Sequence, residues 1–102
     1  MTTISSIIIS ILHRDEDAAH YFQRAKYFKV RAIESHAEAI ESEEFELLAF
    51  SRRHNEAYKR NMRKALERVT FLTGLDEGTV KEVMAQYAME VVSDALIDSV
   101  TL

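Results

Sequence analysis

The pattern that decides the fold lies in residues 15–74, which read DEDAAHYFQRAKYFKVRAIESHAEAIESEEFELLAFSRRHNEAYKRNMRKALERVTFLTG. Apolar and small side chains recur here every three or four residues, which is the period of one helix face, with charged residues between them. The stripe is formed by Ala18, Phe22, Ala25, Ala32, Ile33, His36, Ile40, Leu47, Ser51, His54, Tyr58, Met62, Ala65, Val69 and Leu72. No proline or glycine interrupts this stripe before Gly74, so it predicts helix throughout.

A single helix over residues 16–72 would be far longer than the usual mean of about 11–12 residues. We therefore expect a break near Ser42, whose hydroxyl can cap a second helix with the following glutamates in its first turn. Asp15 is expected to cap the first long helix. The two helices then form an antiparallel hairpin in which position i faces about position 85 − i. One uninterrupted, coiled-coil-like helix is the alternative.

Shorter helices are predicted on both sides of this hairpin. Residues 4–12 (ISSIIISIL) repeat isoleucine and leucine at i, i+3, i+4 and i+7, which favours a helix over a strand that would have no partner. Gly74 is expected to end the second long helix, and Asp76 or Thr79 to begin the last one, with a capping box from Thr79 to Glu82. The last helix is expected to bury Val80, Val83, Met84, Tyr87, Ala88, Val91, Val92, Ala95 and Leu96.

The composition indicates a globular, all-α protein. The chain has 102 residues, 47% of them hydrophobic and 29% charged, with no proline and two glycines, too few turn formers for a β-sandwich. We expect residues 1–102 to form one domain, a small bundle of about four helices. Because the first and last helices are apolar around much of their circumference, self-association as a homo-oligomer is predicted.

The residue types also limit the compartment and the chemistry. The chain has no cysteine, which excludes disulfides, thiolate zinc sites and cysteine nucleophiles. The longest apolar run, residues 4–12, is shorter than a membrane span and has no basic residues before it. We expect a cytoplasmic protein with no membrane partner and no cofactor.

Charge is arranged in blocks. Residues 52–72 carry seven basic and two acidic side chains, whereas residues 73–102 carry one basic and six acidic ones. In the predicted hairpin the cations gather as a surface for a protein partner or for phosphates, with aromatic residues between them. The residues proposed for this surface are Arg24, Lys26, Lys29, Arg52, Arg53, Lys59, Arg60 and Arg63. Because charge runs on helices usually form solvated or paired faces, the pattern favours the interpretation that the acidic last helix, with Glu82, Glu90, Asp94 and Asp98, packs nearby and neutralises these cations.

Two resemblances point to nucleic acid. Residues 66–85 (LERVTFLTGLDEGTVKEVMA) resemble a helix-turn-helix, and residues 62–100 are similar to the N-terminal helix pair of HU-type histone-like proteins, which implies DNA binding. The recognition helix would offer Asp76, Glu77 and Glu82 against one Lys81, and these acids repel phosphate. This chemistry favours a plain helical hairpin turning at Gly74.

Two patterns suggest metal-dependent chemistry. Glu38-Ala-Ile-Glu41 and Glu41-Ser-Glu-Glu44, followed by Glu90 and Asp94, resemble the carboxylate pattern of all-α nucleotide pyrophosphohydrolases of the MazG type, which implies Mg²⁺-assisted hydrolysis. A metal could also be held at residues 13–20, where two histidines and an aspartate share one helix face. Such spacings are common in charged helices, so we expect no metal site and no enzyme activity.

The sequence therefore predicts a small, non-catalytic, helical binding protein that acts on a protein partner as an adaptor, inhibitor or regulator. Association with nucleic acid through the basic hairpin is the alternative.

Overall fold

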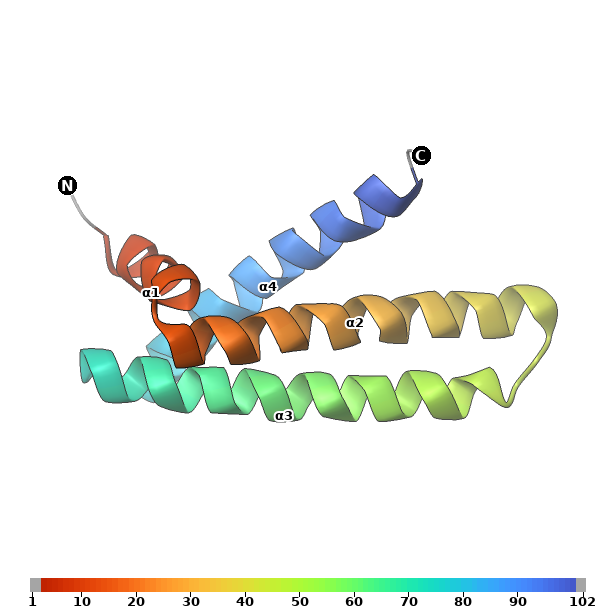
Figure 1. Cartoon of the computed structure of the whole chain (residues 1–102), viewed down its shortest axis with the longest axis horizontal. Helices are drawn as coiled ribbons and strands as arrows, with labels where there is room; N and C mark the ends of the chain where they lie inside the picture. The colour runs from red at the N-terminus through yellow and green to blue at the C-terminus, as the bar shows by residue number, and fades with distance from the viewer. Residues whose placement is uncertain (1–2, 101–102) are drawn as a thin grey trace.

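The computed structural model describes the backbone of residues 3–100 and the side chains of residues 3–98. This part of the chain forms four helices and no strand: α1 (Ile4–Arg14), α2 (Glu16–Ser42), α3 (Leu47–Thr73) and α4 (Glu77–Val100). Helices α2 and α3 lie side by side and antiparallel as a long hairpin, while α1 and α4 pack near its open end (Figure 1). The predicted all-α bundle with two long central helices is confirmed.

One residue makes the corner between α1 and α2. Asp15 has an extended backbone (φ −76°, ψ 125°) and its side chain accepts a hydrogen bond from the Ala18 amide at 2.9 Å. It therefore caps α2 as predicted, satisfying one of the amides that a helix start leaves without a partner. At the other end of α1, Thr3 and Ser6 form a capping box with reciprocal hydrogen bonds of 3.1 Å.

The chain reverses after Ser42, as predicted, but the predicted role of Ser42 is wrong. Ser42 is the last residue of α2, and its hydroxyl donates to the Glu38 carbonyl at 2.6 Å instead of capping α3. Glu43 takes the left-handed conformation (φ 60°), and residues 43–46 cross between two helices whose axes pack roughly 8–10 Å apart. Glu43, Glu44 and Glu46 therefore lie in the connection between the helices and not in the first turn of α3. α3 then begins at Leu47 on tight backbone hydrogen bonds, the first of them from the Leu47 amide to the Glu44 carbonyl.

The seam between α2 and α3 has the predicted register and a narrower buried face than predicted. Ser51 donates to the Ala32 carbonyl at 2.7 Å, a pair close to the expected facing positions. The prediction that His36 and Ile40 are buried is wrong: Ser35 and Ala39 are buried instead, and Ile40 is 59% exposed. The buried positions of α2 follow a repeat of about 3.5 residues rather than 3.6, so the buried face drifts by one residue toward the hairpin tip.

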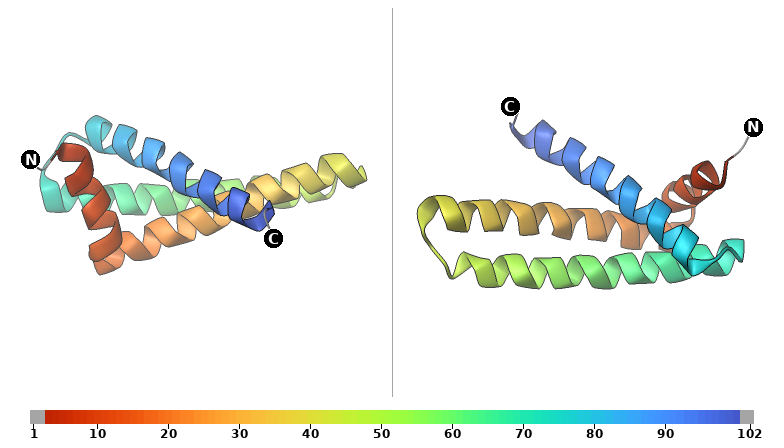
Figure 2. Two further views of the ribbon diagram at one scale, coloured as in Figure 1. Left: turned by 90° about the horizontal axis from the view of Figure 1, so that it is seen from above. Right: turned by 180° about the vertical axis from the view of Figure 1, so that it is seen from behind.

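The core lies at the open end of the hairpin, where all four helices meet. Its largest fully buried side chains are Ile8, Leu12, Phe22, Val69, Val80 and Met84. α1 lies across this end, which confirms that the isoleucine run is helical (Figure 2). The Phe22 ring stacks on Tyr87 of α4 with centroids 5.6 Å apart, and the Tyr87 hydroxyl contacts His13 of α1 at 2.5 Å.

α4 starts at this core and then leaves the hairpin. Gly74 ends α3 in the left-handed conformation (φ 66°), as predicted. Asp76 precedes the first turn of α4 and accepts from the Thr79 amide at 3.1 Å; the predicted capping box is wrong because Thr79 lies inside the helix. The C-terminal half of α4 diverges from α2 and α3, so the tip half of the hairpin projects beyond the other helices (Figures 1 and 2).

Candidate protein-binding groove

An open groove runs between α2 and α3 beyond the part of the hairpin that α4 covers. It has a volume of about 600 Å³ and is lined by Lys29, Ala32, Ile33, His36, Ala37, Leu48, Ser51, Arg52 and Asn55. Each helix supplies one face of the groove, because residues four apart lie one turn from each other: Lys29 and Ile33 on α2, Leu48 and Arg52 on α3. The groove therefore places apolar side chains beside cations.

The floor of the groove is held by two hydrogen bonds between the helices. Ser51 donates to the Ala32 carbonyl at 2.7 Å, and Lys29 Nζ donates to Asn55 Oδ1 at 2.9 Å. The Lys29 ammonium also lies 4.9 Å from the ring centre of Tyr58. Burial raises the pKa of Tyr58, so the phenol beside the Lys29 ammonium stays neutral.

The groove continues beneath α4. A second hollow of about 160 Å³ shares Lys29 and Ile33 with it and is closed on the other side by residues of α4, among them Met89, Val92 and Leu96. The same face of the hairpin is thus covered by a helix in its inner half and open in its outer half. In the inner half, α4 lies against this face of the hairpin, so a helix can pack there.

The eight predicted cations are spread over several surfaces. Lys29 and Arg52 line the groove. Arg52 also borders a shallow hollow along α3 together with Arg53 and Arg60, while Lys59 and Arg63 border a pocket between α3 and α4 that Lys81 shares. The remaining two are on α2: Arg24 lies over the Phe28 ring at 5.6 Å, and Lys26 is half-buried.

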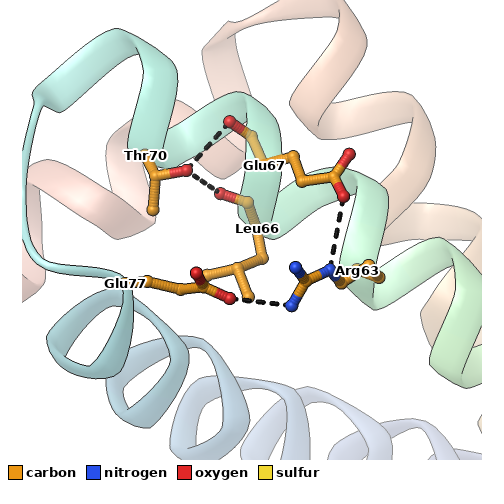
Figure 3. Close-up of polar contacts among 5 residues, drawn as sticks. All are labelled: Arg63, Leu66, Glu67, Thr70 and Glu77. Carbon is orange, nitrogen blue, oxygen red and sulfur yellow. Dashed lines mark hydrogen bonds and ion pairs between the residues drawn. The ribbon is translucent and has the colours of Figure 1, made fainter.

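α4 cancels little of this positive charge. Among the residues with described side chains, the ion pair between α4 and the eight cations joins Arg63 to Glu77 at 2.7 Å, and Arg63 also reaches Glu67 at 3.3 Å. Figure 3 shows the Arg63–Glu77 ion pair, which connects α3 to the first residue of α4. Arg52 and Arg60 form no ion pair within the described part of the chain. Among the acids predicted to neutralise the cations, Glu82, Glu90 and Asp94 form no ion pair with any of the eight in the described side chains; Arg63 pairs with Glu77 instead.

The other sequence patterns are placed as follows. The segment resembling a helix-turn-helix forms the end of α3, the Gly74 turn and the start of α4, where Glu77 is engaged by Arg63. His13 contacts Tyr87, and His20 packs edge-on against Tyr21. In the residues that the structure describes, no group of three or more histidine or acidic side chains is arranged to hold a metal ion.

The structure places two of the predicted cations, Lys29 and Arg52, in the groove, whose apolar walls the sequence pattern does not predict. The pattern predicts Ile33 in the buried stripe, but its side chain is 38% exposed, and Leu48 lies outside the predicted stripe. A usable signal was present: each lies one helical turn from a cation, Lys29 or Arg52, on helices predicted to face each other.

No helix within residues 3–100 combines the length and apolar character needed to cross a membrane. Comparisons of the chain with protein-family models, curated proteins and solved structures found no match.

Proposed function

We propose that the protein is a non-catalytic helical binding protein that acts in the cytoplasm on a protein partner, as an adaptor, inhibitor or regulator. The partner inserts an acidic amphipathic helix into the groove between α2 and α3. The observation that carries this proposal is the chemistry of the groove: Ile33, Ala37 and Leu48 supply an apolar surface, with Lys29 and Arg52 beside it.

A helix suits this groove better than an extended peptide. The groove lies between two antiparallel helices and has no strand edge to pair with, so a bound segment must satisfy its own backbone hydrogen bonds. An amphipathic helix does this and presents its apolar stripe to Ile33 and Leu48. Acidic residues bordering that stripe then lie near Lys29 and Arg52, which selects acidic helices over basic ones.

The proposal is tested with a fluorescent synthetic helix of about 18 residues, or five turns, carrying a leucine stripe bordered by glutamates. Fluorescence anisotropy should detect saturable binding, and Arg52→Glu should weaken it by about tenfold or more because like charges then meet. Arg31→Glu makes the same charge change on the far face of α2, where Arg31 pairs with Glu34 at 3.5 Å, and should leave binding unchanged.

A matched peptide with lysines in place of the glutamates is the second control. Equal binding of both peptides, or equal loss in the Arg52→Glu and Arg31→Glu proteins, would contradict the proposal, since either result shows that groove charge does not select the ligand.

A second function, nucleic-acid binding, is favoured by one observation: Arg52, Arg53 and Arg60 border one hollow, and α4 pairs with none of them in the described residues. If they contact phosphates, binding of a DNA duplex should weaken with salt with a log–log slope near −0.9 per contact. Replacing Arg53 and Arg60 with Ala should reduce that slope by about two contacts. If no duplex binding is detected at low salt, the nucleic-acid hypothesis is wrong.

A further inference from the structure

We propose that the acidic helix that fills the groove is the C-terminal half of α4 from a second copy of this chain. Two copies then exchange these helices about a two-fold axis, each inserting its own α4 into the groove of the other. This inference rests on the proposed function, because it names the occupant of the same groove.

The first observation is a second apolar stripe on α4. Ala88 and Val92 are buried, whereas Met89 and Ile97 are 72% and 59% exposed. Positions 89, 93 and 97 follow one another at four-residue spacing and therefore form one stripe. Glu90 and Asp94 run alongside this stripe at the same spacing. The outer half of α4 thus has the chemistry that the groove selects.

The second observation is that no described residue of α4 lines the outer groove within one copy. Met89 and Ser93 border the small hollow beside Lys29 and Ile33, but the outer lining, which includes Ala37, Leu48 and Arg52, contains none of the described α4 residues. α4 contains no proline, and its only glycine, Gly78, lies in its first turn, so the helix has no residue in its outer half at which to bend back.

The third observation is complementary charge within the same chain. Glu90 and Asp94 form no ion pair with another described residue, and neither does Arg52. The Lys29 ammonium uses one of its three hydrogens on Asn55 and keeps two for an incoming carboxylate. Docking one acidic stripe in one basic groove therefore brings together charges that form no ion pair among the described side chains of a single copy.

Reciprocal exchange also closes the assembly. Each copy has one groove and one stripe, so a two-fold arrangement uses both and leaves no site open for a third copy. Stable interfaces bury about 1,200–2,000 Å² in total, and two equivalent contacts divide this requirement between them. The protein partner then competes with α4 of the second copy for the groove. Self-association therefore inhibits partner binding.

The test measures the mass of the full-length chain by light scattering over a range of concentrations. The wild-type protein should be a dimer. Arg52→Glu places an acid in the groove and Asp94→Lys places a base beside the stripe, so each variant should raise the dimer dissociation constant by about tenfold or more. Both side chains are exposed, so circular dichroism should find both variants folded.

Mixing the two variants gives the sharpest readout. In a mixed dimer, the acidic groove of the Arg52→Glu copy would receive the basic helix of the Asp94→Lys copy, while the other groove and the other helix are both wild-type. An equimolar mixture should therefore recover the dimer that each variant alone has lost. Arg31→Glu and Glu82→Lys make the same kinds of charge reversal outside the contact, and both variants should remain dimeric.

Three results overturn the inference: a wild-type monomer at all concentrations, a dimer that neither charge reversal weakens, or weakened variants whose mixture stays monomeric. The acidic probe peptide separates this failure from failure of the proposed function. If the wild-type protein is monomeric and still binds the peptide through Arg52, the groove has its proposed role and the occupant is not α4. If the peptide does not bind either, both proposals are wrong.

Discussion

The two halves of the α2–α3 hairpin are built from the same pair of helices and have different surroundings. At the open end, α1 and α4 cover the hairpin, and Phe22 and Val69 are at most 1% exposed. At the tip, the two helices have only each other among the described elements, and Phe45 and Phe50 are 62% and 48% exposed. The fully buried large side chains therefore lie at the open end, although Phe71 and Leu72 at the end of α3 are also exposed there (78% and 43%).

This difference shows that large side chains in the apolar stripes of α2 and α3 are buried only where a third helix covers them. Two helices alone bury the narrow line along which they touch, and here that line holds small residues, such as Ala32, Ser35 and Ala39. Larger side chains outside that line need α1 or α4 to exclude water from them. The tip half of the hairpin, which α1 and α4 do not cover, therefore keeps apolar side chains such as Phe45 and Phe50 exposed.

The largest expected effect compares an aromatic residue from each half. Phe22→Ala should lower the free energy of unfolding by about 3–5 kcal/mol, because it removes a buried ring and leaves a cavity among packed helices. Phe45→Ala should change it by less than about 0.5 kcal/mol, since that ring is mostly in water. Urea unfolding followed by circular dichroism measures both. Similar losses in the two variants would mean that the tip is as covered as the open end.

A smaller effect is expected at the narrow seam of the tip. Ala39 is fully buried between α2 and α3, so Ala39→Leu should destabilise the protein by about 1–3 kcal/mol through overpacking. The loss should appear as faster hydrogen exchange in residues 33–52, with the core at the open end still protected. Ala49→Leu, at an exposed position of the same half, is the control and should be close to neutral. Equal exchange at both ends after Ala39→Leu would show one cooperative unit.

The smallest effect concerns the corner between α1 and α2. Arg68 donates to the Asp15 carboxylate at 2.9 and 3.1 Å, which, with the Ala18 amide, holds the pKa of Asp15 below its ordinary value and raises the pKa of Arg68. A lowered carboxyl pKa contributes stability that is complete above the unfolded value, near 4, and is lost as the pH falls through the folded value.

The melting temperature should therefore fall below about pH 4 more steeply in the wild-type protein than in Asp15→Asn, which keeps a capping side chain but loses the charge. The difference should shrink with added salt, because both side chains are partly exposed (20% for Asp15, 33% for Arg68). Glu82 is an exposed acid of α4, so Glu82→Gln should leave the fall in melting temperature at low pH unchanged. If the melting temperatures of the wild-type and Asp15→Asn proteins fall equally steeply below about pH 4, the pKa argument is wrong.

The sequence by itself determined the elements and their pairing. Helix starts and ends at Asp15 and Gly74 depend on contacts within a few residues, and a hairpin register of about 85 − i follows from equal rise on both sides of a reversal. These features need only local hydrogen bonding and the period of the apolar pattern. The structure confirms the all-α fold with its long hairpin, and it places Lys29 and Arg52, two of the predicted cations, in the lining of the groove.

Only the tertiary structure decided which side chains are covered and which cations share a surface. His36 and Ile40 were expected inside and lie outside, and the apolar walls of the groove, Ile33 and Leu48, were not recognised. The first outcome follows from the 3.5-residue repeat of the contact between α2 and α3, and the second depends on the direction in which α4 leaves the hairpin. That direction is set by packing against Phe22 and Ile8 at the far end of the molecule, a sum of weak contacts between residues distant in sequence. A local pattern carries no information about such a sum.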